Sequence, residues 1–271
     1  MSFIEHKKQE LIYHTSSLME RECGIVHGFS TRLGGVSEGM CASLSLRGSE
    51  ACEDTAENVA ENYRRFCAAV GGDVNNVVLA RQVHEDTVRI VTAADAGKGL
   101  WQERDYTADA LITNEPGLPL FVFSADCIII LLSDSRSGAV GAVHAGWRGA
   151  ALGIVKKAVE KMGRVFGTRA EDIRAAIGAG IGNCCFETHD DVPDAMRGAW
   201  GSEAEPFITA VGEKWQVDLK AINRRLLTLA GVKEENIDVC PLCTACHPEL
   251  YWSHRKMGNA RGVQAGMIMK V

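Results

Sequence analysis

The sequence predicts a mixed α+β fold in which sheets and helices pack in layers. Predicted strands outnumber predicted helices, and several strands follow one another with no helix between them. That order favours a layered α+β architecture over a doubly wound parallel sheet, in which strands and helices alternate. The 271 residues are enough for one large domain or two small ones, and the chain shows no internal repeat, low-complexity tract or clear linker.

The strands are predicted from short, β-branched apolar runs bounded by turn residues. The two clearest runs lie between Phe121 and Gly149, and the turn Asp134–Gly138 between them is typical of a hairpin. The remaining strands are expected within residues 11–26 and at Val77–Arg81, Val88–Val91, Ala108–Thr113, Ile173–Ala179, Ile237–Val239, Leu250–Ser253 and Val263–Met269.

The helices are predicted from apolar residues that recur at helical spacing and from their end signals. The clearest case begins at the N-cap candidate Asp218, runs to about Ala230 and is closed by Gly231. The other predicted helices are Glu53–Val70, Gly149–Phe166 and Asp190–Trp200.

Composition excludes several classes of protein. With a net charge of −6, the chain lacks the overall positive charge that is typical of a nucleic-acid-binding protein. The first 14 residues lack the apolar core of a signal peptide, and no apolar run is long enough to span a bilayer. We therefore expect a cytoplasmic protein. In a reducing compartment its ten cysteines are expected to be metal ligands, a nucleophile or buried thiols.

Three residues stand at the edges of apolar elements, where a sheet can direct them into a cavity. They are His84, Cys127 and His144. Two imidazoles and a thiolate can bind zinc and leave a fourth position for water. The same residues can form a metal-free Cys–His nucleophile pair. They can also be two core histidines and a buried cysteine, because free cysteine is usually buried.

Other cysteines offer a competing site. Cys240, Cys243, Cys246 and His247 have the CxxCxxCH spacing of a zinc or iron–sulfur site, although buried thiols are the alternative. Neighbouring residues of an extended chain point in opposite directions, so we leave the vicinal pair Cys184–Cys185 off the ligand set.

Seven motifs occur in an order that resembles one known family. They are STRLGGVS, QVH, ADALIT, ADC before an aliphatic run, AVHAGWRG, GIGNCCFE, and CTAC with ELYWSHR. The family is the multicopper polyphenol oxidase (laccase) domain, also called the peptidoglycan editing factor family, whose better-supported activity is that of a purine nucleoside enzyme. The resemblance extends from about His27 to Met269.

The resemblance implies a single-domain, four-layer αββα sandwich with mixed sheets over residues 1–271. It implies zinc bound by His84, Cys127 and His144, with copper as the alternative metal. The implied reaction is phosphorolysis of adenosine, inosine and S-methyl-5′-thioadenosine to the free base and (methylthio)ribose 1-phosphate, with adenosine deamination as a second activity. Its partners would be purine nucleosides and phosphate, with no nucleic acid and no membrane.

Further roles follow for individual side chains. Deamination needs an acid to protonate the leaving ammonia, and Asp126 is a candidate for that catalytic acid unless its role is structural. Phosphorolysis needs cations for phosphate, for which Arg32 and Arg148 are candidates unless they hold loops. Asp109 of ADALIT is a candidate hydrogen-bond acceptor near the site.

Three other functions stay open. A copper-dependent polyphenol oxidase would need more clustered histidines than this chain shows. A hydrolase that edits a peptidoglycan precursor would use Cys127 as nucleophile and His144 as base. A metal-binding or partner-binding module would show no turnover.

Overall fold

The computed structural model describes residues 3–47 and 54–271, and in these ranges the strands form two six-stranded sheets and one three-stranded sheet. The first sheet has the order β1 (Phe3–Lys8), β2 (Leu11–Ser16), β3 (Ile25–Ser30), β15 (Gln264–Lys270), β7 (Leu120–Ser124) and β4 (Val78–Leu79). The second has the order β14 (Ile237–Val239), β10 (Arg174–Ile177), β8 (Ile128–Asp134), β9 (Ala139–Ala145), β6 (Ala110–Thr113) and β5 (Val88–Ile90). The small sheet has the order β11 (Glu187–Thr188), β13 (Lys214–Val217) and β12 (Ile208–Val211).

The α-helices of these ranges are α1 (Ala56–Val70), α2 (Trp147–Ala151), α3 (Ile154–Phe166), α4 (Asp191–Trp200), α5 (Leu219–Leu229) and α6 (His254–Met257). Single 3₁₀ turns occur at Met19–Arg21, Gly39–Cys41, Val74–Asn76, Ala93–Asp95, Ala170–Asp172, Gly201–Glu203, Glu205–Phe207 and Glu234–Asn236.

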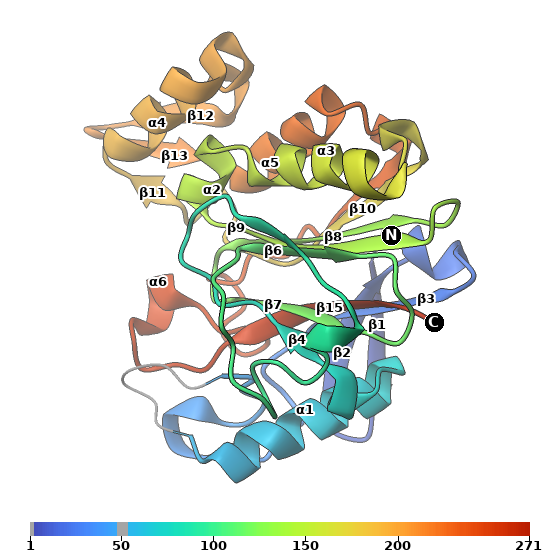
Figure 1. Cartoon of the computed structure of the whole chain (residues 1–271). Helices are drawn as coiled ribbons and strands as arrows, with labels where there is room; N and C mark the ends of the chain where they lie inside the picture. Colours follow the sequence, from blue (N-terminus) through green and yellow to red (C-terminus); the bar gives the residue numbers. More distant parts are fainter. Residues whose placement is uncertain (1–2, 48–53) are drawn as a thin grey trace.

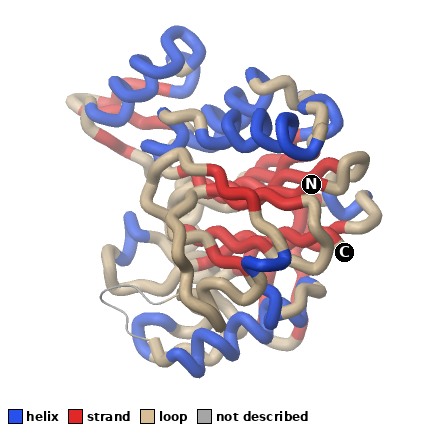
Figure 2. Tube along the Cα trace, viewed as in Figure 1, coloured by secondary structure: helices blue, strands red, loops and turns tan. Residues whose placement is uncertain are grey.

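The elements stack in four layers, as Figure 1 shows. The two large sheets lie face to face, α1 covers the outer face of the first, and α3 and α5 cover the outer face of the second. Figure 2 shows the same arrangement, with strands in the middle and helices outside. The predicted mixed αββα sandwich is therefore confirmed, and α4 with the small sheet projects beyond the layers.

Alternating side chains fill the spaces between the layers. In β8, Ile129 and Leu131 pack between the two sheets, whereas Ile128 and Ile130 pack toward the α3 and α5 layer. Both faces of the strand are buried, which explains why its sequence is continuously apolar rather than alternating.

Three predicted elements have different bounds in the structure. The first of the two clearest apolar runs, Phe121–Leu132, divides into β7 and β8, which belong to different sheets. The expected helix Gly149–Phe166 is broken at Gly153, whose φ of 74° is left-handed. The helix expected from Glu53 begins at Ala56 after the N-cap Thr55, and residue 53 lies outside the described residues.

The strand expected at Leu250–Ser253 is wrong. The Gln264 side chain accepts a hydrogen bond from the Trp252 backbone N–H at 2.8 Å and donates one to its carbonyl at 3.1 Å. A side chain thus takes the place of a neighbouring strand, while Tyr251 and Trp252 remain fully buried. Strands β1, β11, β12 and β13 and helix α6 were not predicted from the sequence. Among residues 3–47 and 54–271, no helix combines the length and the apolar character needed to cross a membrane.

Candidate active site

Cys127 lies where the chain crosses from one large sheet to the other. Strand β7 ends at Ser124 in the first sheet, and β8 begins at Ile128 in the second. The crossing is tight, because Asp126 has a left-handed φ of 96° and the Ser124 hydroxyl donates to the Cys127 carbonyl at 2.5 Å. The crossing places Cys127 at the end of β7 and the start of β8, where the chain passes between the two sheets.

His144 reaches the same edge from the neighbouring strand. In the antiparallel β8–β9 pair, Ile129 lies opposite His144 and Ile128 lies opposite Ala145. The imidazole is 2% exposed, and its Nδ1 lies 2.9 Å from Asp109 Oδ1. That contact leaves Nε2 as the nitrogen available to other groups.

His84 is held by the same carboxylate. It lies on the loop after β4 with a left-handed φ of 63°. The Asp109 carboxylate accepts backbone N–H groups of Val83, His84 and Glu85 at 3.0, 3.0 and 3.1 Å. One fully buried side chain therefore shapes the His84 loop and orients His144.

The structure brings His84, Cys127 and His144 together. One ligand atom from each lies within 4.8 Å of the others, and Cys127 Sγ is 4.0 Å from His84 Nε2. The imidazole rings are nearly perpendicular, with centroids 5.0 Å apart. A Cβ at Gly146 would lie 3.0 Å from Cys127 Sγ, so this glycine keeps the space beside the thiol open. Two nitrogens and a sulfur converging on open space fit a zinc ion.

Without a metal, the thiol and the imidazole stabilise each other as an ion pair. Burial alone would raise the pKa of Cys127, but the His144 and His84 imidazoles outweigh it and lower this pKa to about 6. Burial alone would lower the pKa of His144, but Cys127 and Asp109 outweigh it and raise this pKa to about 9. The thiol is therefore poised as a thiolate, the form that both a metal and an electrophile require.

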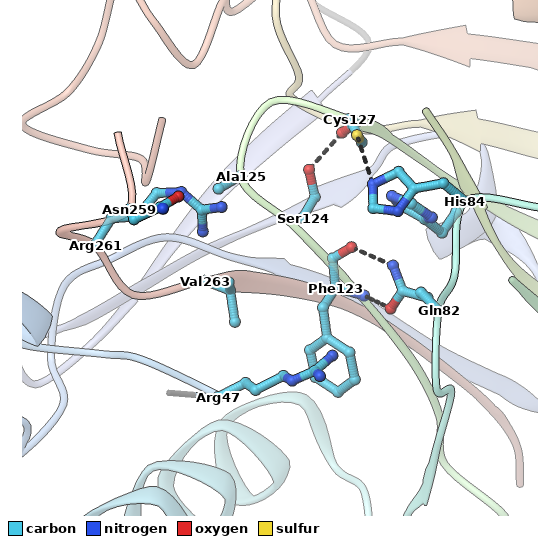
Figure 3. Close-up of a pocket in the computed structure, with 11 residues that line it drawn as sticks. Arg47, Gln82, His84, Phe123, Ser124, Ala125, Cys127, Asn259, Arg261 and Val263 are labelled. Atoms are coloured by element: carbon cyan, nitrogen blue, oxygen red, sulfur yellow. Dashed lines mark hydrogen bonds between the residues drawn. The ribbon is translucent and has the colours of Figure 1, made fainter. Parts of the chain in front are cut away.

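A cavity of about 470 Å³ opens onto this cluster (Figure 3). Figure 3 shows Arg261 and Asn259 on one side of it and His84 on the other, with Arg47 below. The described residues that line it are Arg47, Gln82, His84, Phe123, Ser124, Ala125, Cys127, His144, Asn259, Arg261 and Val263. They include two arginines and no carboxylate, so the cavity suits an anion.

Neither arginine singled out from the sequence belongs to this described lining. Arg32 donates to the carbonyl oxygens of Pro248 at 2.7 Å and Ala42 at 2.9 Å. The Arg148 guanidinium lies 4.2 Å from the ring centroid of its neighbour Trp147. Arg32 thus joins two loops, and Arg148 covers an aromatic ring outside the cavity.

The carboxylate of Asp126 also lies away from the cavity. Thr244 Oγ1 donates to its Oδ1 at 2.6 Å, and the Arg255 backbone N–H donates to its Oδ2 at 2.7 Å. Both oxygens are therefore engaged in holding other segments of chain. These contacts favour the structural alternative for Asp126 over the role of catalytic acid.

The sequence left several contributors unidentified. Arg47, Asn259 and Arg261 carry no motif that marks them, and the fold brings them to the cavity from distant segments. The Gln82 amide donates to the Phe123 carbonyl at 2.7 Å and accepts its N–H at 2.8 Å. Gln82 could have been anticipated, because it belongs to the same QVH motif as His84.

A second cluster of ligand-type residues differs from the expected one. Cys243 and Cys246 lie together with Cys184 and Cys185, all four ligand atoms within 4.8 Å of one another. Cys240 is buried outside this group, and His247 lies 3.2 Å from Glu249. The vicinal pair can face one point because Cys184 and Cys185 lie in a turn, not in a strand.

Comparison with known proteins gives one consistent result. A family model described as multi-copper polyphenol oxidoreductase laccase matches residues 26–271. Purine nucleoside phosphorylase YlmD of Bacillus subtilis (strain 168) is 32% identical over 249 residues, covering 90% of this chain and 88% of that protein. Adenosine deaminase RL5, from an unknown prokaryotic organism, is 32% identical over 241 residues, covering 88% of this chain and 91% of that protein. The crystal structure of YlmD from Geobacillus stearothermophilus matches with a TM-score of 0.89 and 31% identity, covering 98% of this chain and 97% of that chain.

Proposed function

Because the chain belongs to the multi-copper polyphenol oxidoreductase laccase family, we propose that it is a zinc-dependent purine nucleoside phosphorylase with adenosine deaminase activity. Relatives named for these two reactions support an enzyme that acts on purine nucleosides. The observation that carries the proposal is the cavity in which two arginines face a cluster of two histidines and a cysteine.

We assign zinc to His84, Cys127 and His144. When bound, zinc supplies a Lewis acid that polarises oxygen and lowers the pKa of water toward ~7. Copper would also bind such donors, and by affinity order more tightly. The described residues contain one other ligand cluster, and it consists of thiols alone. A multicopper oxidase would need several histidine-rich sites, so this donor set favours a single ion that is not redox-active.

Phosphorolysis requires the cavity to bind both phosphate and a nucleoside. A phosphate oxygen forms a bond to C1′ of the ribose while the glycosidic C–N bond breaks, and the purine leaves with the electron pair and takes up a proton. The phosphate needs fixed cations, which we assign to Arg47 and Arg261 in place of Arg32 and Arg148. Arg261 donates from Nη1 to the Gly262 carbonyl at 3.1 Å and forms no ion pair with a carboxylate among the described residues, so its charge is available to phosphate.

The apolar part of the cavity suits the nucleoside. Phe123 and Val263 line it, and the Phe123 backbone is held on both sides by the Gln82 amide. An apolar wall suits a 5′-methylthio group and rejects a 5′-hydroxyl only weakly. We therefore include adenosine, inosine and S-methyl-5′-thioadenosine among the substrates, with free base and (methylthio)ribose 1-phosphate as products.

Deamination is expected to be the slower reaction. It requires a proton for the departing ammonia, and no carboxylate is among the described residues that line the cavity. His144 cannot supply this proton, because its Nδ1 contacts Asp109 and its Nε2 would bind the zinc ion. We therefore expect phosphorolysis to exceed deamination when phosphate is present.

The test incubates the purified, zinc-loaded protein with adenosine, with and without phosphate, and separates adenine, inosine and hypoxanthine by chromatography. Adenine that forms only with phosphate, and inosine that forms without it, would support the proposal. Both products should disappear in His84→Ala. Absence of both products from zinc-loaded wild type would overturn it.

One competing function uses the same residues without metal. The Cys127 thiolate beside His144 could act as the nucleophile of a hydrolase that edits a peptidoglycan precursor. That reaction would survive a chelator and stop on alkylation of the thiol. The nucleoside reaction should stop with the chelator and return when zinc is restored.

A further inference from the structure

Four cysteines converge at a place the nucleoside reaction does not use. The Sγ atoms of Cys184 and Cys185 lie 3.6 and 3.4 Å from that of Cys246, and Cys243 completes the group. All four thiols are free of disulfide bonds. None of them lines the cavity at Cys127, so this group is separate from the candidate active site.

The spacing fits one metal ion. Zinc–sulfur bonds of about 2.3 Å in a tetrahedron place the sulfurs about 3.8 Å apart. The two Sγ–Sγ distances to Cys246 are slightly shorter than this, and all four sulfur atoms lie within 4.8 Å of one another. Iron–sulfur clusters hold their thiolates on several irons and therefore spread them more widely. The group matches a single soft divalent cation.

The backbone around the thiols is shaped for this arrangement. Each pair lies in a turn closed by hydrogen bonds, from Cys185 N–H to the Gly182 carbonyl at 3.0 Å and from Cys246 N–H to the Cys243 carbonyl at 3.2 Å. The Gly182 N–H donates to Cys243 Sγ at 3.2 Å, a contact that stabilises a thiolate. A Cβ at Gly182 would lie 3.2 Å from Cys184 Sγ, so glycine leaves the turn room to close.

The cations near the four thiols are an independent reason to expect a bound metal ion. Lys220 is 7% exposed, and its ammonium donates to the carbonyls of Cys240 at 2.9 Å and Leu242 at 2.6 Å, next to Cys243. Lys220 forms none of the ion pairs found among the described residues. Arg255 adds a second cation by donating to the Cys185 carbonyl at 2.7 Å. Four thiolates around a divalent ion carry an excess of two negative charges, which two cations balance.

We propose that Cys184, Cys185, Cys243 and Cys246 bind one structural zinc ion, separate from the ion at the candidate active site. The ion would join two turns that both hold Asp126. Ile181, beside the first turn, donates its N–H to the Asp126 carbonyl at 2.8 Å. Thr244, within the second turn, donates to its carboxylate at 2.6 Å. Because Asp126 precedes Cys127, the ion fixes the crossing that presents the active-site thiol.

The test counts metal ions in three variants of the full chain, each expressed with zinc and examined by native mass spectrometry and elemental analysis. Wild type should hold two zinc ions per chain, and Cys246→Ser and His84→Ala should each hold one. Cys246 is exposed, so serine there should not prevent folding. Cys23→Ser, which changes an exposed thiol outside both clusters, should still hold two.

A second readout identifies the ligands. Cobalt added to metal-free His84→Ala should produce tetrahedral d–d bands and strong thiolate-to-cobalt charge transfer, and both should be lost in His84→Ala/Cys246→Ser. One zinc per wild-type chain with none in His84→Ala would overturn the inference, as would a disulfide or an iron–sulfur chromophore at these cysteines. Nucleoside turnover is measured separately, so failure here leaves the proposed reaction untouched.

Discussion

Replacing Asp109 by asparagine would test how the candidate active site is held together. The carboxylate is fully buried and accepts hydrogen bonds from three backbone N–H groups and from His144. Asparagine has one carbonyl oxygen and one NH₂ group. Whichever way the amide turns, two of these four donors would face another donor.

The magnitude follows from these contacts. Hydrogen bonds to a charged group contribute about 1.5–3 kcal/mol each, so two lost bonds cost about 3–6 kcal/mol before relaxation. We expect Asp109→Asn to lower the free energy of unfolding by about 3 kcal/mol or more. Residues behind metal ligands typically change metal affinity by about 10- to 100-fold, and we expect zinc affinity to fall within that range.

The loss of stability in Asp109→Asn should also depend on pH. Burial alone would raise the pKa of Asp109, but hydrogen bonds from His144 and the backbone outweigh it and lower this pKa. The carboxylate therefore contributes stability above its unfolded-state pKa, and the contribution is lost as the pH falls through the folded-state pKa. The difference in unfolding free energy between wild type and Asp109→Asn should accordingly shrink in acid.

Urea denaturation at several pH values and zinc competition with a chromophoric chelator would measure both quantities. Asp105→Asn is the matched control, because that side chain is 74% exposed and should change stability by less than about 0.5 kcal/mol. If Asp109→Asn bound zinc within twofold of wild type and unfolded at the same urea concentration, Asp109 could not have the organising role described above.

Three other outcomes are expected. Gly146→Ala should weaken zinc binding about tenfold, measured by the same competition, because its Cβ would lie 3.0 Å from Cys127 Sγ; unchanged affinity would mean that the metal lies elsewhere. Arg261→Met should raise the KM for phosphate about tenfold or more while the zinc content stays constant. The control Arg164→Met, at an exposed position, should leave this KM unchanged. If Arg261→Met and wild type had the same KM for phosphate, Arg261 would not bind phosphate. In metal-free protein, alkylation of Cys127 should stay fast down to about pH 6 and slow below it, because the thiolate is the reactive form. An alkylation rate that instead fell with an inflection near pH 9 would contradict the ion pair with His144.

Local sequence determined most elements of the fold. Helix α5 follows the N-cap Asp218, whose side chain accepts the Ala221 N–H at 2.9 Å, and Gly231 beyond its end is in a left-handed conformation. The apolar run at β8 has both faces buried, as a continuous run predicts. Capping, glycine conformation and hydrophobic pattern act within a few residues, so a reading of the chain captures them.

Candidate site residues could be selected from the sequence where chemistry and position coincide. His84, Cys127 and His144 each stand at the end of an apolar element, and the family motifs mark all three. Their meeting depends on Asp109, whose hydrogen bonds reach chain 24 to 35 residues away. No local pattern records a contact of that length.

Tertiary structure alone decided where the remaining polar groups point. Asp126 accepts a hydrogen bond from Thr244 and is not among the described residues that line the cavity, while Arg261 reaches the cavity from a distant segment. Cys184 meets Cys246 across 62 positions because the two segments follow the neighbouring parallel strands β10 and β14. A residue's type states which chemistry it can perform, but its backbone angles and the packing of distant elements determine what it faces.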